Sequence, residues 1–310
     1  MQRTPKYASL LRVRALCLRP FYEAVPDSRL RVFSAAAKAF LRMTDIRTIL
    51  HRTTRDLAAG GSPSPRLDAE VLLMRFLGMD RLQLCMHPER ELSQEEAAGF
   101  VRWVKRRNLG EPIAYILGEK EFWSLRFEVG REVLIPRPET ECLIEEVLRF
   151  YRTPGEGLRI FDIGTGSGAI GVVLARELPA ARVAATDVSP GAIAVACRNA
   201  VAHGVAGRME FFEGDLFAAV SGDWDIICSN PPYVQEDQYE LLPAGIRNFE
   251  PREAFIAGPD GTAFHRRIIR EGAHRLKAEG RIFLEIGEGQ EGLVDSLFRE
   301  AGCYADISFR

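Results

Sequence analysis

The hydrophobic pattern is most regular from residue 158 onward, where short apolar runs alternate with amphipathic segments. Short apolar runs are typical of buried strands, and apolar residues three or four positions apart are typical of helices. Alternation of the two favours an α/β fold with a doubly wound, mostly parallel, Rossmann-like sheet. Right-handed crossovers would place its first strand in the middle. The predicted strands are 159–163, 182–186, 209–212, 224–229 and 281–286, the predicted helices are 169–177, 192–203, 262–277 and 289–301, and another strand begins at 304–309.

Residues 44–109 show helical spacing instead and predict a small helical domain. Thr44 and Asp45 can cap its first helix, and Ser93 with Glu96 forms a capping box before a later one. That later helix carries basic side chains away from its apolar positions. We interpret them as a solvated face, with docking of an anionic partner as the alternative. They are Arg102, Lys105, Arg106 and Arg107.

Two short alternating runs between 118 and 133 predict a β-hairpin that joins the helical part to the sheet. The prolines that follow favour an extended backbone, and Pro138 suits the first turn of the next helix. Glu139 and Glu141 would stabilise the positive end of that helix. The expected organisation is a basic extension over 1–42, a helical domain over 43–117, a hairpin linker over 118–135 and a larger domain over 136–310.

Composition excludes several classes of protein. The chain is 46% hydrophobic and 27% charged with a net charge of −2, which is typical of a globular protein and gives no general reason to expect nucleic acid as a partner. No apolar run reaches the ~20 residues of a membrane span. The six cysteines and five histidines show no metal-ligand spacing, so we expect neither a disulfide framework nor a metal.

The first 42 residues differ from the rest, since they carry nine basic and two acidic side chains. An arginine-rich, acid-poor leader can be an organellar transit peptide, which would make the protein mitochondrial. We favour an extension outside the native fold, with Met43 as the true start, because nothing that follows depends on it. The expected location is then the cytoplasm.

A glycine-rich turn joins the strand at 159–163 to the next helix. Glycines permit a tight turn and let a ligand approach bare backbone. A dinucleotide fingerprint would read G-x-G-x-x-G, whereas the order here is G-x-G-x-G. We interpret the turn as part of a nucleotide-type cofactor site. The alternatives are a site for a nicotinamide cofactor and a turn that serves only packing. The turn consists of Gly164, Thr165, Gly166, Ser167 and Gly168.

Two aspartates follow the next two strands. Asp187 comes nineteen residues after Gly168, where a carboxylate can accept both ribose hydroxyls of a nucleotide. Asp215 is placed to accept an adenine amine, and Leu216 and Phe217 could pack on the ring. Together with the glycine turn, these residues predict a site for an adenosine-containing cofactor.

The apolar run at 224–229 ends in Asn230, Pro231, Pro232 and Tyr233. Prolines end a strand and remove two N–H donors, so the carbonyls of this corner remain free to accept. A carboxamide, free carbonyls and a ring suit a flat group with N–H bonds, such as an amide or a nucleobase amine. A simple strand-ending turn is the alternative. Hydride transfer has no use for this corner, so it favours S-adenosylmethionine over a nicotinamide cofactor.

From about residue 66 to the end, the chain resembles the glutamine methyltransferases of peptide chain release factors, the HemK or PrmC family. Asn-Pro-Pro-Tyr alone is shared with DNA and RNA amine methyltransferases. Three other stretches are more specific to the family. They are Gly-Glu-Pro-Ile-Ala-Tyr-Ile-Leu-Gly at 110–118, Pro-Arg-Pro-Glu-Thr-Glu at 136–141, and Phe-Glu-Pro at 249–251 followed by Ala-Gly-Pro-Asp-Gly at 257–261.

The resemblance implies an N-terminal helical bundle joined by a hairpin to a seven-stranded class I methyltransferase sheet. Residues 164–168 would cradle the methionine part of S-adenosylmethionine, Asp187 would hold its ribose, and Leu216, where several relatives carry an aromatic residue, would line its adenine. The family also implies a last antiparallel strand after Phe309. Without it, the sheet would have an exposed edge and lower stability than an extended chain.

The implied reaction methylates the side-chain amide nitrogen (N5) of the glutamine in the Gly-Gly-Gln loop of a release factor. Asn230, which would also line the cofactor site, and Pro231 would each accept one amide N–H, while Pro232 and Tyr233 complete the pocket. No carboxylate or histidine is obviously supplied as a base. One alternative is a nucleic-acid amine methyltransferase, which would need a basic groove that this nearly neutral chain does not indicate. Another is a non-catalytic cofactor-binding protein.

Overall fold

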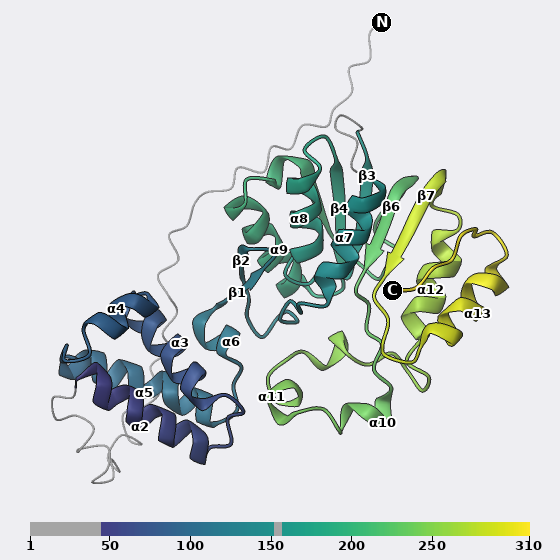
Figure 1. The fold of residues 1–310 in the computed structure, drawn as a ribbon. Helices are drawn as coiled ribbons and strands as arrows, with labels where there is room; N and C mark the ends of the chain where they lie inside the picture. The colour runs from purple at the N-terminus through teal and green to yellow at the C-terminus, as the bar shows by residue number, and fades with distance from the viewer. Residues whose placement is uncertain (1–44, 152–156) are drawn as a thin grey trace, which may run out of the picture.

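The computed structural model describes residues 45–151 and 157–310, so the basic extension at 1–42 lies outside the described residues. A helical part, a hairpin and a sheet covered by helices follow one another along the chain (Figure 1). Two short 3-10 helices are η2 (Ala206–Arg208) and η3 (Arg252–Ala254).

The helical part has an apolar cluster of its own, which confirms helical structure there. Asp45 caps the first helix by accepting a hydrogen bond from the Thr48 N–H at 2.7 Å. Ser93 and Glu96 form the expected capping box, and together these caps satisfy N–H groups that a helix end leaves unpaired. The helices are α2 (Ile46–Ala59), α3 (Pro65–Leu77), α4 (Arg81–Met86), α5 (Gln94–Asn108) and α6 (Ile113–Leu117).

The interpretation of the basic side chains of α5 as a solvated face is wrong for two of them. Arg106 donates to both carboxylate oxygens of Glu111 at 2.7 Å. Arg107 donates to the buried Asp68 at 2.7 Å and is only 16% exposed. These pairs tie α5 to α3 and to the loop before α6, so this part of the face holds the helices together.

The hairpin forms as expected from β1 (Glu119–Phe122) and β2 (Leu125–Glu128), which pair antiparallel. Trp123 and Ser124 in the turn both have positive φ, 53° and 55°, a conformation that matches the twist of the two strands. The buried rings of Phe122 and Phe127 belong to the main apolar cluster of the sheet. The hairpin is therefore packed on the sheet.

The sheet has the order β5-β4-β3-β6-β7 with every pairing parallel, which confirms the doubly wound fold with the first strand in the middle (Figure 1). Ile160 faces a cluster with α7 and α8, whereas Phe161 and Ile163 face a cluster with α12, so helices cover both faces. The strands are β3 (Arg159–Ile163), β4 (Arg182–Asp187), β5 (Met209–Glu213), β6 (Trp224–Ser229) and β7 (Leu276–Leu284). The helices are α7 (Thr140–Phe150), α8 (Ala169–Glu177), α9 (Pro190–Ala202), α10 (Glu236–Tyr239), α11 (Ala244–Arg247), α12 (Ala263–Gly272) and α13 (Glu291–Ala301).

Several predicted bounds are wrong. The helix expected at 262–277 ends at Gly272, and the strand expected at 281–286 begins at Leu276, because Leu276 already pairs with Trp224 before the register shifts. Pro138 precedes α7 rather than lying in its first turn, since the helix begins at Thr140 with Glu139 as its N-cap.

The described residues form five strands in this sheet rather than seven, and 304–309 is not a strand. Two observations explain the second point. Tyr304 packs its ring edge-on against Phe298 and donates its hydroxyl to the carbonyl of Ile269 at 2.6 Å, so it turns toward α12 and α13. Asp306 has φ 55°, which interrupts an extended backbone.

Candidate active site

The site forms where three neighbouring strands end. Ile163 at the end of β3 is in register with Ser229 at the end of β6, and the Ser229 hydroxyl donates to the Ile163 carbonyl at 2.7 Å. β4 lies on the other side of β3 and ends at Asp187. Gly164, Asp187 and Asn230 are therefore brought to one edge of the sheet, where ligands bind in open α/β folds.

The three glycines of the turn have positive φ values, 67° at Gly164, 55° at Gly166 and 81° at Gly168. A Cβ atom on either of the first two would meet nothing within 4 Å, so bare backbone there faces open space. A Cβ atom on Gly168 would lie 3.1 Å from Ala196 of α9. The first two glycines thus fit a cofactor cradle, and the third permits close packing of two helices.

Asp187 is held against this turn. One carboxylate oxygen accepts the Gly166 N–H at 2.9 Å, and the other accepts the Ser189 N–H at 2.9 Å. Burial raises the pKa of Asp187, while these hydrogen bonds oppose the rise. The next residue, Val188, is 57% exposed although it is apolar.

Asp162 fastens the turn from inside the core. Its Oδ2 accepts the Thr165 hydroxyl at 2.6 Å and the Gly171 N–H at 3.0 Å, and its Oδ1 has no hydrogen-bond partner among the described residues. Complete burial raises the pKa of Asp162 to about 6. This carboxylate supports the backbone of the cradle from behind.

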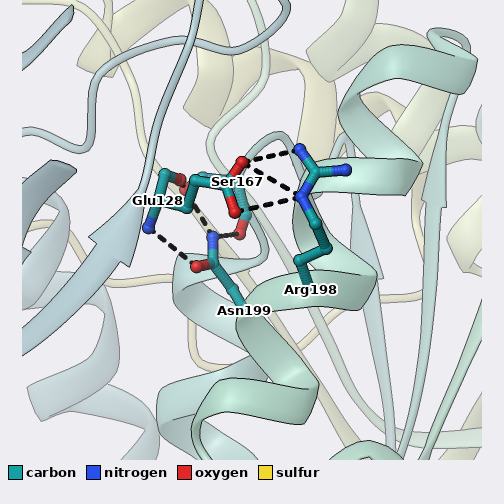
Figure 2. Close-up of polar contacts among 4 residues, drawn as sticks. All are labelled: Glu128, Ser167, Arg198 and Asn199. Carbon is teal, nitrogen blue, oxygen red and sulfur yellow. Dashed lines mark hydrogen bonds and ion pairs between the residues drawn. The ribbon is translucent and has the colours of Figure 1, made fainter. Parts of the chain in front are cut away.

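Asn199 links the turn to the hairpin, as Figure 2 shows. Its side-chain nitrogen donates to the carbonyls of Ser167 at 2.8 Å and Glu128 at 3.0 Å, and its oxygen accepts the Glu128 N–H at 2.7 Å. The neighbouring Arg198 forms an exposed ion pair with the Glu128 carboxylate. Asn199 is buried, so its hydrogen bonds join β2, α9 and the glycine turn into one unit.

The Asn-Pro-Pro-Tyr corner is fixed from behind. The Val234 N–H donates to Phe255 at 2.7 Å, and the side chain of Gln290 donates to the Tyr233 carbonyl at 2.9 Å. Among the described residues, no hydrogen bond reaches the carbonyls of Pro231 and Pro232, which leaves both as available acceptors.

Two residues without an expected role complete the corner. The Asn230 side-chain nitrogen donates to the Thr140 hydroxyl at 3.0 Å, and that hydroxyl donates to Glu285 at 2.7 Å. Tyr233 donates its hydroxyl to the other oxygen of Glu285 at 3.3 Å. A carboxylate therefore lies in the site, bonded to two hydroxyls, and the expectation that no base is supplied stays a prediction. The predicted strand at 281–286 included Glu285, whereas in the structure β7 ends at Leu284 and Glu285 follows it, as Asn230 follows β6.

Burial governs the charge states of this group. It raises the pKa of Glu285, against the opposing hydrogen bonds from Thr140 and Tyr233. It also raises the pKa of Tyr233 to about 12, with the charge of Glu285 adding to the effect. Tyr233 therefore keeps its proton at neutral pH and acts as a donor to Glu285.

Known proteins resemble this chain over most of its length. The PrmC N-terminal domain profile matches residues 48–118, and the methyltransferase small domain profile matches residues 140–245. Release factor glutamine methyltransferases of Rhodopirellula baltica and Moorella thermoacetica are 37% and 43% identical to it, over 84% of this chain in both cases and over 89% and 91% of the relatives. The chain belongs to the release factor glutamine methyltransferase family. A solved methyltransferase structure from Pyrococcus furiosus is similar with 21% identity and a TM-score of 0.44, over 66% of this chain and 90% of that chain.

Two of the stretches that carry the resemblance, at 136–141 and 249–261, contact each other or the corner. Glu250 accepts the Ile135 N–H at 3.1 Å and pairs with Arg137 at 2.6 Å, which joins the segment after the hairpin to the segment after β6. A Cβ atom on Gly261 would lie 2.4 Å from the Tyr233 carbonyl oxygen, so only glycine permits this approach.

Asp215 and Leu216 contact residues other than those of the group around Asn230. Both carboxylate oxygens of Asp215 pair with Arg267 of α12, at 3.1 and 2.8 Å. The Leu216 side chain is buried in a core cluster with Phe161 and Phe217, and its φ is 50°. Their contact with an adenine stays a prediction.

In the part of the chain that the structure describes, no group of three or more histidine, cysteine or acidic side chains could hold a metal ion. Among the helices over 45–151 and 157–310, none has the length and apolar character needed to cross a membrane.

Proposed function

We propose that this protein transfers a methyl group from S-adenosylmethionine to the side-chain amide nitrogen of the glutamine in the Gly-Gly-Gln loop of a peptide chain release factor. The observation that carries the proposal is the Asn230 carboxamide, bonded through its nitrogen to Thr140 at the same sheet edge as the glycine turn. Family membership supports the release factor as substrate.

The residues of the turn fit the cofactor. Gly164 and Gly166 leave bare backbone open to a ligand, and the half-buried carboxylate of Asp187 retains lone pairs for ribose hydroxyls. Bound S-adenosylmethionine supplies a methyl group made reactive by the positive charge on its sulfur. Asp187 and the residues of 164–168 would hold it, with Val188, Asp215 and Leu216 as candidates near the adenine.

The task of the corner is to place and polarise a weak nucleophile, because the lone pair of an amide nitrogen is delocalised into its carbonyl. The Asn230 Oδ1 and the Pro231 carbonyl each accept one N–H of the substrate amide, which directs the remaining lone pair toward the methyl donor and stabilises positive charge that develops on nitrogen. The Tyr233 ring packs on the flat amide, and its hydroxyl is held in place by a hydrogen bond to Glu285.

The chain organisation fits a protein substrate. We assign 43–117 as a helical domain for a second contact with the release factor, 118–135 as a linker and 136–310 as the methyltransferase domain. Asn199 and Glu250 join the linker to the methyltransferase part.

Methyl transfer can be tested with labelled S-adenosylmethionine, a release factor and duplex DNA in parallel reactions. The expected result is label in the release factor and, by mass spectrometry, one methyl on the glutamine of its Gly-Gly-Gln peptide. Asn230→Ala should lower kcat by about 100-fold or more with cofactor affinity nearly unchanged, and Asn108→Ala, an exposed control, should match the wild type. Label in DNA alone, or loss of cofactor affinity without loss of turnover, would overturn the proposal.

A further inference from the structure

A carboxamide can act as an acceptor only if its oxygen, and not its nitrogen, faces the substrate. The two ends of an asparagine side chain are nearly the same size, so packing alone does not decide which end faces the site. For Asn230 the decision must come from the groups that its far end contacts, Thr140 and Glu285.

The hydrogen bonds in this group have only one consistent direction. Glu285 in its ionised form can only accept, so the Thr140 hydroxyl at 2.7 Å must donate its single proton to it. The same hydroxyl oxygen can then only accept from Asn230 at 3.0 Å, which requires the Asn230 nitrogen on that side. The Asn230 oxygen is thereby turned to the opposite side, where no described residue donates a hydrogen bond to it.

We infer that Thr140 and Glu285 are positioning residues that fix the Asn230 carboxamide with its oxygen toward the substrate amide. The inference rests on the proposed function, since it assigns the orientation that the reaction needs. Neither residue touches the reacting atoms. Glu285 sets the direction of the Thr140 hydroxyl, and both groups set the direction of the carboxamide, whose nitrogen faces them.

The backbone keeps Glu285 in place for this task. Its N–H donates to the Ser229 carbonyl at 3.0 Å, and its carbonyl is 2.8 Å from the ring nitrogen Nε2 of the buried His265. Tyr233 occupies the second carboxylate oxygen at 3.3 Å, so the first oxygen remains directed at Thr140. The carboxylate is fixed between β6, β7 and α12, while Thr140 comes from the first residue of α7.

Acid should remove the orientation, because a protonated Glu285 becomes a donor and no longer requires the Thr140 hydroxyl to point toward it. Burial raises the pKa of Glu285, and the nearby negative charge of Glu139 acts in the same direction. The other groups that face it are the hydroxyls of Thr140 and Tyr233 and the amide of Asn230, which oppose the rise. Burial lowers the pKa of His265, which therefore stays neutral beside the carbonyl. The expected kcat falls as pH decreases through this raised pKa.

The test compares variants at both positions. Thr140→Val removes the hydroxyl at nearly constant volume and should lower kcat by about 30-fold, with cofactor affinity within about twofold of the wild type. Thr140→Ser keeps the hydroxyl and should recover kcat to within about threefold. Glu285→Gln can present either end to Thr140, so it should lower kcat by about 10-fold and lose the acid limb of the pH profile. The matched controls are Thr54→Val, whose hydroxyl bonds within α2, and Glu279→Gln, which is exposed on β7.

A second measurement does not depend on turnover. The side-chain amide of Asn230, followed by nitrogen-proton NMR, should exchange slowly with solvent in the wild type and in Thr140→Ser, and quickly in Thr140→Val. Equal exchange in all three would overturn the inference, as would equal losses of kcat in Thr140→Ser and Thr140→Val, or an unchanged acid limb in Glu285→Gln. A wild-type protein that shows the slow amide but does not methylate glutamine would overturn the proposed function and leave the orientation standing.

Discussion

The buried carboxylate of Asp162 should make the protein less stable as pH rises from 5 to 8. Its pKa is about 6 in the fold and 3.8 as the ordinary value, and the cause is complete burial. Between these two values the folded state binds more protons than the unfolded state, so stability falls with rising pH across this window and is constant above it. The direction is opposite to that of a salt-bridged aspartate.

The magnitude follows from the difference between the two pKa values. A difference of about two pKa units between the folded and unfolded states corresponds to about 3 kcal/mol of folding free energy. Between pH 5 and pH 8 the part expected from Asp162 is about 1 kcal/mol, because the folded-state carboxyl is mostly protonated at pH 5 and almost fully ionised at pH 8. Asp162→Asn keeps an oxygen for the Thr165 hydroxyl and the Gly171 N–H while it removes the titration.

Urea unfolding of the wild type and Asp162→Asn at pH 5 and pH 8 measures this difference directly. The stability of the wild type relative to the variant should be about 1 kcal/mol lower at pH 8 than at pH 5, since contributions from other groups cancel in the comparison. Asp223→Asn, at an exposed position, serves as the control. If the stabilities of the wild type and Asp162→Asn change in parallel over this range, the carboxylate is not destabilised by burial and the reasoning is refuted.

Three further predictions concern the cradle and its supports. Asp187→Ala should weaken cofactor binding by about 10-fold or more in calorimetry while kcat at saturation changes little, because it removes the acceptor for ribose hydroxyls; unchanged affinity would contradict this role. Gly168→Ala should lower the free energy of unfolding by about 2 kcal/mol, because of left-handed strain and the contact with α9. Gly164→Ala should lower it by about 1 kcal/mol and mainly weaken cofactor binding. The reverse order of the two variants in urea unfolding would refute the distinction. Asn199→Ala should lower the free energy of unfolding by about 2–3 kcal/mol and speed hydrogen exchange in the hairpin, while Arg198→Ala, which loses only the exposed pair, should cost less than about 1 kcal/mol.

The sequence was sufficient for the parts of the molecule that follow local rules. Strand-ending positions are visible as polar residues after apolar runs, and parallel strands bring them to one edge, so Gly164, Asp187 and Asn230 could be placed together from the order of residues alone. Helix caps and the hairpin follow from short-range patterns in the same way. These features depend on few residues and on backbone geometry alone.

Long-range side-chain contacts were not predictable. The hydrogen bond between Thr140 and Glu285 joins positions 145 residues apart, and the local sequence around Thr140 indicates only the start of a helix. Asn199 lies within a helix, where nothing in the sequence indicates that its side chain reaches the hairpin. Tyr304 was predicted to start a strand, whereas its side chain contacts Ile269 and Phe298 of the two last helices. These are tertiary contacts that the local sequence does not reveal. In each case the outcome depends on which elements become neighbours.

The group formed by Thr140, Asn230 and Glu285 has a consequence for biosynthesis. Its members come from α7, the end of β6 and the end of β7, so the corner is incomplete until residue 285 has left the ribosome and β7 has joined the sheet. A nascent chain that stops earlier can display the glycine turn and still lack an oriented amide pocket. Competence for the reaction should therefore arise late in synthesis, when β7 docks on β6.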